Sequence, residues 1–321
     1  MQTALFSFLV FCLICPAIPV QAAANRPDDF YSFWAETGKE LSQIPLESRI
    51  EAAASNQPDD DVVCRKVSYR SLNSQRVHAW YCYPAGRPGP FPAILISPWF
   101  GQGAIDVSRD INRKGFAILS YQARGFEVDQ PSYPPQNGDY IREGIDDAKT
   151  YAYRQIVANG LQGLAFLKSR PEIDKNRIGT AGASQGGALS LILAALDPRI
   201  RAAAANFPYL CNLVESVKKA DDSPYSQIQE YIKDHSGSGE RVLNTLSYFD
   251  VLNFAASLRI PVLVQRGLKD TIAPASDIAI AFDAIPSTNK KLLTYPNAAH
   301  ADNNDLRRKD MFDFLENQLS R

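Results

Sequence analysis

Residues 177–187 read Arg-Ile-Gly-Thr-Ala-Gly-Ala-Ser-Gln-Gly-Gly, and an apolar, helix-favouring run follows over 187–196. They contain the pattern G-x-S-x-G at the predicted junction of a buried strand and a helix. Glycines are needed at 182 and 186, because side chains there would collide with the neighbouring strand and helix. Such a turn holds a serine on a strained backbone with its hydroxyl exposed above the sheet. We therefore predict that Ser184 is a nucleophile; the alternative is a glycine-rich turn with an incidental serine.

The chain alternates short apolar runs with amphipathic helical segments. Besides the strand that enters the serine turn, the predicted strands are 91–98, 116–121, 201–207, 260–265 and 291–294. The predicted helices are 148–170, 187–196, 276–284 and 306–319. This alternation is typical of a mostly parallel sheet with helices on both faces. Because no linker divides the chain, we predict the fold class α/β and a single domain over residues 25–321.

Two segments interrupt the alternation. The first combines an N-terminal helix, beginning near Pro27, with a β-hairpin whose strands 62–70 and 75–83 flank a turn. The second, residues 209–247, is helix-rich and polar, and we interpret it as a helical insertion or cap above the sheet.

Residues 1–24 have the pattern of an export signal. An almost unbroken apolar run, Ala4 to Val20, precedes small residues that offer cleavage after Ala22 or Ala24. The first three residues lack Lys and Arg, which departs from the usual signal, and the alternative is an uncleaved membrane anchor. Because the apolar run is short for a membrane span, we expect a cleaved signal peptide, an exported protein (periplasmic or secreted) and no membrane contact afterwards.

Export would leave three cysteines, Cys64, Cys82 and Cys211, in the mature chain. A hairpin turn centred on Asn73 places Cys64 directly opposite Cys82, and opposed residues on antiparallel strands come close enough for a disulfide. The prediction is a Cys64–Cys82 bond, with two free thiols as the alternative. Cys211 would then be an unpaired, buried small apolar residue.

A serine nucleophile needs a base that accepts its proton. In a sheet of this kind the partners follow the serine in the order acid, then histidine, each after a later strand. Of three histidines, His78 precedes the serine within the hairpin and His235 lies in the polar insertion. His300 follows the last predicted strand, so we predict that His300 is the base.

The acid that orients this base should leave the preceding strand. Asp270 does so, at the end of Gly-Leu-Lys-Asp over 267–270. Asp277 falls within the next predicted helix, and Asp302 is too close in sequence to the histidine. We predict that Asp270 orients the base; the alternative is that it merely caps the turn.

Two backbone N–H groups should stabilise the oxyanion. One is predicted at Gln185, where the helix begins, and the other in the loop 97–103, where Trp99 or Phe100 would donate. No histidine or cysteine pair has metal-ligand spacing, and residues 302–305 lack the rest of a calcium loop, so neither a metal nor another cofactor is expected. The formal net charge of −1 offers no basic excess for binding nucleic acid.

With these residues in place, the chain resembles the acetyl xylan esterase and cephalosporin C deacetylase family of carbohydrate esterases, from about Asp28 to the C-terminus. The stretches that carry the likeness are 29–34, 44–46, 182–187, 207–210, 246–250 and the loops of Asp270 and His300. The resemblance implies the α/β-hydrolase fold, catalytic roles for Ser184, Asp270 and His300, and N–H donors at Trp99 (typically tyrosine in the family) and Gln185. It also implies the removal of acetyl groups from sugars and small esters, and a closed homo-oligomer.

The chain departs from the family pattern at two positions. Phe126 stands where the family usually has glutamine after Arg-Gly, and Ala301 stands where it usually has glutamate after the histidine. Neither change touches the predicted triad, but both alter its surroundings. Phe126 suits core packing as well as pocket lining.

The sequence thus predicts an exported serine esterase that acts on a small acetylated ester or oligosaccharide. Within hydrolases, the alternative is a peptidase of the prolyl-oligopeptidase type, which usually needs a large gating domain for which about 300 residues leave no room. Outside enzymes, the alternative is a non-catalytic binding scaffold, which predicts a broken triad.

Overall fold

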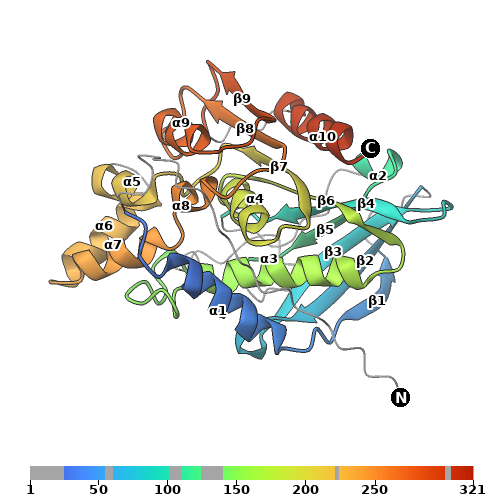
Figure 1. Ribbon diagram of the computed structural model, residues 1–321, viewed down its shortest axis with the longest axis horizontal. Coiled ribbons are helices and arrows are strands. Elements are labelled where there is room, and N and C mark those ends of the chain that lie inside the picture. Colours follow the sequence, from blue (N-terminus) through green and yellow to red (C-terminus); the bar gives the residue numbers. More distant parts are fainter. Residues whose placement is uncertain are drawn as a thin grey trace.

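A mostly parallel sheet lies at the centre of the molecule (Figure 1). The computed structural model describes residues 25–54, 61–100, 110–123, 140–220, 224–300 and 305–320. In this part of the chain the sheet has nine strands in the order β1-β2-β3-β5-β4-β6-β7-β8-β9. Their bounds are Arg49–Ala54 (β1), Val62–Arg70 (β2), Arg76–Pro84 (β3), Phe91–Ser97 (β4), Ala117–Tyr121 (β5), Ile173–Ala183 (β6), Ile200–Asn206 (β7), Val262–Gly267 (β8) and Lys290–Tyr295 (β9). Strands β4 to β9 pair in parallel, which confirms the predicted α/β architecture.

Helices cover both faces of this sheet. One layer holds α1 (Phe30–Ser42), α3 (Ala152–Ser169), α4 (Gln185–Leu196), α8 (Val251–Ala255) and α9 (Ala275–Asp283), and the other holds α2 (Asp110–Arg113) and α10 (Asp305–Leu319). Strand β4 is therefore covered on both faces. Leu95 packs against the layer that contains α3 and α4, Ile94 packs against the layer that contains α10, and every residue of the strand is buried. A strand that is buried on both faces consists of a continuous apolar run, so β4 can be predicted from the sequence.

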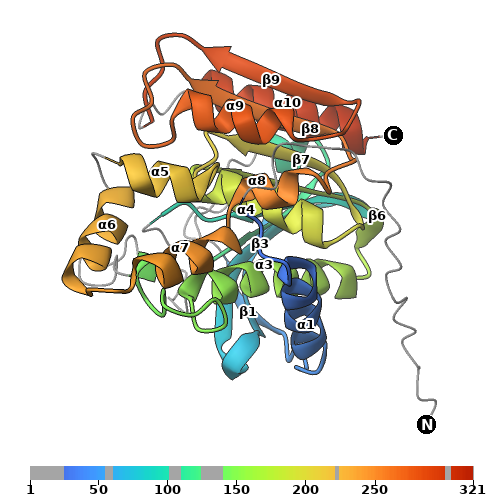
Figure 2. The same cartoon turned by 60° about the vertical axis from the view of Figure 1, so that its left-hand side comes forward.

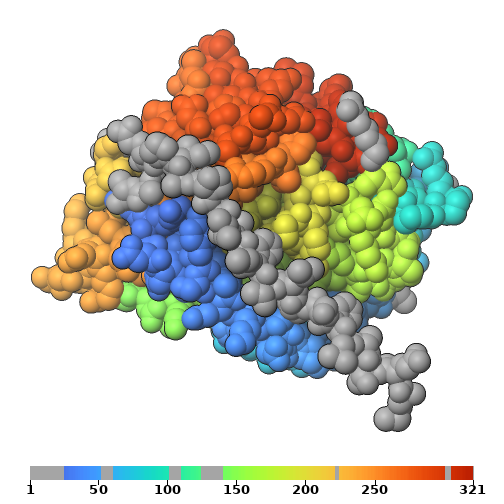
Figure 3. Space-filling view, in the orientation of Figure 1, coloured from blue at the N-terminus to red at the C-terminus, as the bar shows by residue number. Residues whose placement is uncertain are grey.

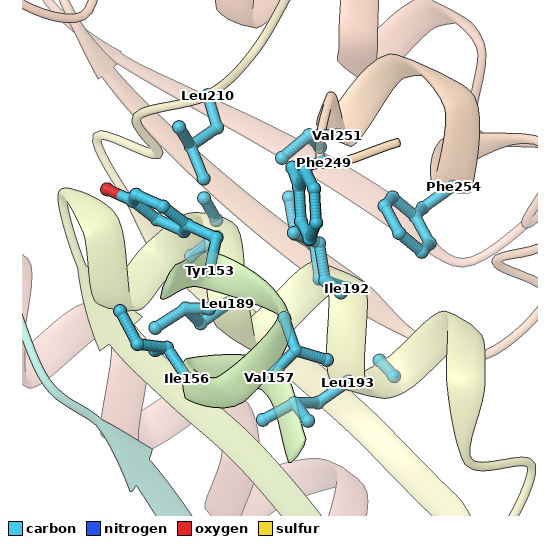
Figure 4. Packing of buried hydrophobic residues seen from close by; sticks show 14 of the residues in the cluster. Tyr153, Ile156, Val157, Leu189, Ile192, Leu193, Leu210, Phe249, Val251 and Phe254 are labelled. Carbon is cyan, nitrogen blue, oxygen red and sulfur yellow. The ribbon is translucent and has the colours of Figure 1, made fainter. Parts of the chain in front are cut away.

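Helices α3 and α4 meet in the largest apolar core. Figure 4 shows Ile156 and Val157 of α3 beside Leu189 and Ile192 of α4, with Phe249 packed over them. Helix α4 is apolar around its whole circumference and almost wholly buried, as expected of a helix enclosed on every side. The helix that begins at the serine is therefore anchored deep within the fold.

The hairpin of β2 and β3 has the predicted register. Cys64 lies opposite Cys82, and their sulfur atoms form a disulfide bond. The turn is a short 3-10 helix, Leu72–Ser74, in which Asn73 has a φ of 54°. Cys211 is buried and forms no disulfide with any described residue.

Two local features differ from the sequence predictions. Strand β1 has no counterpart among the predicted strands; it widens the antiparallel end of the sheet by pairing with β2. Helix α3 begins at Ala152 rather than at 148, because a turn precedes it in which Asp147 accepts hydrogen bonds from the N–H groups of Thr150 and Tyr151. Side-chain periodicity alone does not distinguish such a turn from the first turn of a helix.

Three helices, α5 (Leu213–Lys219), α6 (Tyr225–Asp234) and α7 (Gly239–Ser247), occupy the segment between β7 and α8. Figure 2 shows them together at one side of the molecule. On the face shown in Figure 3, the blue segment that contains α1 lies against the orange segment of α7. The indole N–H of Trp34 donates to the Tyr248 carbonyl at 3.1 Å, and the Tyr248 hydroxyl donates to Asp29. These bonds connect the N-terminal helix to the residues that follow α7.

A buried ionic cluster joins the ends of α3 and α4. Asp197, directly after α4, accepts hydrogen bonds from Lys168 at 2.5 Å and from Arg199 at 2.8 and 2.9 Å. The side chains of Asp197 and Lys168 are only 5% and 12% exposed. Burial raises the pKa of Asp197, but the bonds to Arg199 and Lys168 outweigh it and hold the pKa below its ordinary value.

Asp197→Asn should therefore destabilise the protein by about 3 kcal/mol at pH 7, because it leaves the Lys168 ammonium buried without its counter-charge. Since the folded-state pKa of Asp197 lies below its unfolded value, this contribution is present above about pH 4 and is lost as the pH falls further. Urea unfolding at pH 7 and pH 3.5 would measure both effects. Arg199→Gln is the matched control, expected to cost less than about 1 kcal/mol because Arg199 is largely exposed. Equal unfolding midpoints for the wild type and the Asn variant at pH 7 would contradict the prediction.

Candidate active site

Ser184 occupies a sharp turn between β6 and α4. Its backbone has φ 55° and ψ −121°, a conformation that costs a non-glycine residue about 1–3 kcal/mol. The surrounding backbone maintains it: the Ser184 N–H donates to the Asn206 carbonyl at 2.9 Å, and the Ser184 carbonyl accepts from Tyr209 N–H at 3.0 Å. This is the strained strand-to-helix turn that the sequence predicts.

The two glycines of the motif are required by close backbone approach. A Cβ atom at Gly182 would lie 2.4 Å from the backbone of Gly186, and one at Gly186 would lie 2.3 Å from the Ser97 carbonyl oxygen. Backbone atoms on both sides of the turn leave no room for adjustment. The start of α4 therefore packs directly on the end of β4.

A continuous hydrogen-bonded chain runs from the serine to a carboxylate. Ser184 Oγ and His300 Nε2 are 2.7 Å apart, and His300 Nδ1 and Asp270 Oδ2 are 2.8 Å apart. The three side chains come from three separate segments, after β6, after β9 and after β8. The side chain of Asp270 is fully buried, and that of His300 is 16% exposed. The structure thus brings together the residues predicted as nucleophile, base and acid.

Asp270 also caps its own turn. Its Oδ1 accepts hydrogen bonds from the N–H groups of Ile272 and Ala273 at 2.9 and 2.8 Å, while Oδ2 faces the imidazole. The two roles weighed for this residue therefore coexist on its two oxygens. Because an ionised carboxylate only accepts hydrogen bonds, Nδ1 of His300 carries a proton, which leaves Nε2 free to accept one from the serine.

The other two histidines lie elsewhere. His78 pairs with Ser68 in the register of the hairpin. His235 is exposed and stacks on Tyr231 with ring centroids 4.0 Å apart. Neither contacts the serine.

The two predicted oxyanion donors belong to segments that meet at the start of α4, because a Cβ atom at Gly186 would lie 3.2 Å from the Pro98 carbonyl carbon. Gln185 is the first residue of α4, and Trp99 lies two residues beyond β4 with 37% of its surface exposed. The N–H of Trp99 has no hydrogen-bond partner within the described ranges. A free N–H beside a helix N-terminus is a suitable donor to an oxyanion.

The Gln185 side chain is fully buried and has three polar contacts that the sequence does not indicate. Its Oε1 accepts from the hydroxyls of Tyr140 at 2.7 Å and Tyr153 at 2.8 Å, and its Nε2 donates to the Pro98 carbonyl at 3.3 Å. The tyrosines precede it by 45 and 32 residues. Only the tertiary fold brings them to the site, so no local motif could have indicated them.

Several segments named in the sequence analysis lie outside the described residues: the end of the 97–103 loop from residue 101 onwards, the departures Phe126 and Ala301, and residues 1–24. Among the residues that are described, no cluster of three or more His, Cys, Asp or Glu side chains is arranged to hold a metal ion. No described helix combines the length and apolar character of a membrane span.

The chain is similar to known proteins over most of its length. A family model described as acetyl xylan esterase (AXE1) matches residues 20–318. An acetyl xylan esterase structure from Paenibacillus sp. R4 superposes with a TM-score of 0.83 at 27% identity, covering 94% of this chain and 100% of that one. Acetyl xylan esterase 1 from Thermoanaerobacterium sp. JW/SL YS485 gives 0.79 at 28% identity, covering 91% and 94%.

A curated relative, the acetyl esterase Axe7A of Xylanibacter ruminicola, is 26% identical over 288 residues. The match covers 84% of this chain but 63% of that protein, which is therefore considerably longer than the region shared. These likenesses and the sheet order identify the architecture as the α/β-hydrolase fold, as expected from the sequence.

Proposed function

Because the chain belongs to the acetyl xylan esterase family, a family of carboxylic-ester hydrolases, we propose that it removes acetyl groups from esters through Ser184, His300 and Asp270. The observation that carries the proposal is the hydrogen-bonded chain of these three side chains, with separations of 2.7 and 2.8 Å. Family membership supports the reaction class, and the geometry supports the assignment of roles.

The first half-reaction acylates the serine. Ser184 Oγ attacks the ester carbonyl while His300 Nε2 accepts its proton, and the carboxylate of Asp270 stabilises the imidazolium that forms. Negative charge develops on the carbonyl oxygen, where the N–H groups of Trp99 and Gln185 would stabilise it. Collapse of this intermediate breaks the C–O bond, and His300 returns the proton to the departing alcohol.

The second half-reaction hydrolyses the acetyl-enzyme. A water molecule replaces the alcohol and loses a proton to His300 Nε2 as its oxygen attacks the acyl carbon. The intermediate then releases acetate, and the proton returns to Ser184 Oγ. The chain's own residues account for every proton transfer.

The substrate class is proposed from the relatives. Their names specify acetyl xylan or acetyl esters, and we extend this to acetylated oligosaccharides and small acetyl esters. Export is proposed from the signal pattern of residues 1–24, and the Cys64–Cys82 disulfide supports it, because disulfides persist mainly in oxidising compartments.

We expect a fluorophosphonate probe to label one serine per chain, Ser184, and peptide mass spectrometry to locate it. In a panel of 4-nitrophenyl esters, kcat/KM should fall about tenfold or more from acetate to octanoate, because an acyl site that fits the methyl group of an acetyl ester would exclude longer chains. Acetylated xylo-oligosaccharides should release acetate, and a Gly-Pro anilide should remain intact. An unlabelled protein would indicate a non-catalytic scaffold, and rapid anilide cleavage would indicate a peptidase.

A further inference from the structure

The buried amide of Gln185 has an unambiguous orientation. The Pro98 carbonyl oxygen can only accept a hydrogen bond, so the group facing it at 3.3 Å must be the NH2 group of the amide. The carbonyl end then faces the hydroxyls of Tyr140 and Tyr153, both of which can donate. One amide therefore satisfies two tyrosine hydroxyls and one backbone carbonyl, all within the interior.

The carbonyl that Gln185 contacts belongs to the peptide unit that carries a predicted oxyanion donor. Pro98 C=O and Trp99 N–H are the two ends of one planar trans peptide, so they point in opposite directions. A bond that fixes the direction of the carbonyl thereby fixes the direction of the N–H. If this peptide rotated, Trp99 N–H would turn away from the substrate.

We propose that the Gln185 side chain is a positioning residue, which holds the 98–99 peptide with Trp99 N–H directed towards the oxyanion. This inference rests on the proposed function and extends it. Gln185 would then act twice: its backbone N–H stabilises the oxyanion directly, and its side chain aligns the second donor. It also favours Trp99 over Phe100 as that donor, because the oriented peptide carries the N–H of Trp99.

The packing around this loop supports the role. A Cβ atom added at Gly186 would lie 3.2 Å from the Pro98 carbonyl carbon, so the loop after β4 packs on the start of α4. The ring of Tyr140 lies 5.0 Å from that of Phe100, the residue that follows Trp99 in the chain. Pro98 and Phe100 thus contact Gln185 and Tyr140, which are buried and hydrogen-bonded to each other, while Trp99 between them remains partly exposed.

The test is the Gln185→Met variant, which keeps the shape of the side chain and the backbone N–H but removes the bond to Pro98. We expect kcat/KM for 4-nitrophenyl acetate to fall about 10- to 100-fold, less than the loss of a whole oxyanion donor. The loss should appear in kcat rather than KM, and the inhibition constant of a boronic acid, whose serine adduct mimics the tetrahedral intermediate, should rise by the same factor. The dependence of kcat/KM on pH should keep its wild-type shape, since the triad is intact. Fluorophosphonate titration would normalise each rate to the number of folded sites.

Two further variants separate positioning from packing. Tyr140→Phe/Tyr153→Phe keeps the bond to Pro98 and should lose less than about fivefold. The triple variant, which adds Gln185→Met, replaces all three polar groups by apolar groups of similar shape, and this limits the cost in stability. Its kcat/KM should fall by the same 10- to 100-fold as that of Gln185→Met alone. If Gln185→Met, or the triple variant where the single one is unstable, stays within about threefold of the wild type, the positioning role is wrong. A wild type that neither reacts with the probe nor hydrolyses acetate esters would instead refute the proposed function.

Discussion

Ser184→Ala should lower kcat for 4-nitrophenyl acetate by about a million-fold, the scale known for removal of the nucleophile in another serine hydrolase. The reason is structural: Ser184 Oγ is the atom that faces His300 Nε2 at 2.7 Å, so its removal leaves the base without a nucleophile to activate. Alanine occupies the turn with the same backbone requirement as serine, so the fold should survive. Residual turnover would come from water held near the oxyanion donors.

The measurement is steady-state hydrolysis together with fluorophosphonate labelling, both expected to be abolished. Ser169→Ala is the matched control, because Ser169 lies at the end of α3 and its hydroxyl donates to the Phe166 carbonyl, away from the triad. It should keep the activity and labelling of the wild type. A Ser184→Ala protein that still hydrolyses acetate esters at one hundredth of the wild-type rate would refute Ser184 as the nucleophile.

The parts of this site that the sequence predicts are those determined by local backbone chemistry. The strained turn at Ser184 demands glycines at fixed offsets, because a Cβ atom at Gly182 or Gly186 would clash with neighbouring backbone. Asp270 follows the apolar run of β8 and His300 follows the more polar β9, and parallel strands end at the same edge of a sheet. The order of elements therefore brings the three side chains together.

The parts that could not be predicted depend on tertiary contacts. Tyr153 reaches the Gln185 amide because α3 packs against α4, and Tyr140 reaches it from the segment before α3. Nothing in the local sequence of either tyrosine indicates a polar role. Strand β1 likewise forms by pairing with the outer side of β2. Its own sequence, Arg-Ile-Glu-Ala-Ala-Ala, has no clear alternation of apolar and polar residues that would indicate a strand. Motif and periodicity identify the reacting groups, whereas the residues that orient them require the three-dimensional structure.

Asp270→Asn should lower kcat about 10,000-fold at neutral pH by imposing the wrong tautomer on His300, the magnitude known for this substitution in the chymotrypsin-type triad. The structure dictates the orientation of the new amide. The N–H groups of Ile272 and Ala273 need an acceptor, so the oxygen of asparagine stays on that side and its NH2 group faces His300 Nδ1. Nδ1 must then accept, the proton moves to Nε2, and the nitrogen beside Ser184 Oγ can no longer take its proton.

The variant should fold normally, because the two turn-capping bonds remain, and its thermal midpoint would show this. Asp277→Asn is the control: Asp277 accepts from Asn212 and Ser216 at 2.8 and 2.9 Å and takes no part in the triad, so kcat should be retained even where stability falls. If Asp270→Asn keeps kcat within about tenfold of the wild type, the residue serves only to cap its turn. A fall in kcat of about 10,000-fold with an unchanged thermal midpoint would instead show that the two carboxylate oxygens have different functions. Oδ1 would stabilise the turn, and Oδ2 would serve the reaction.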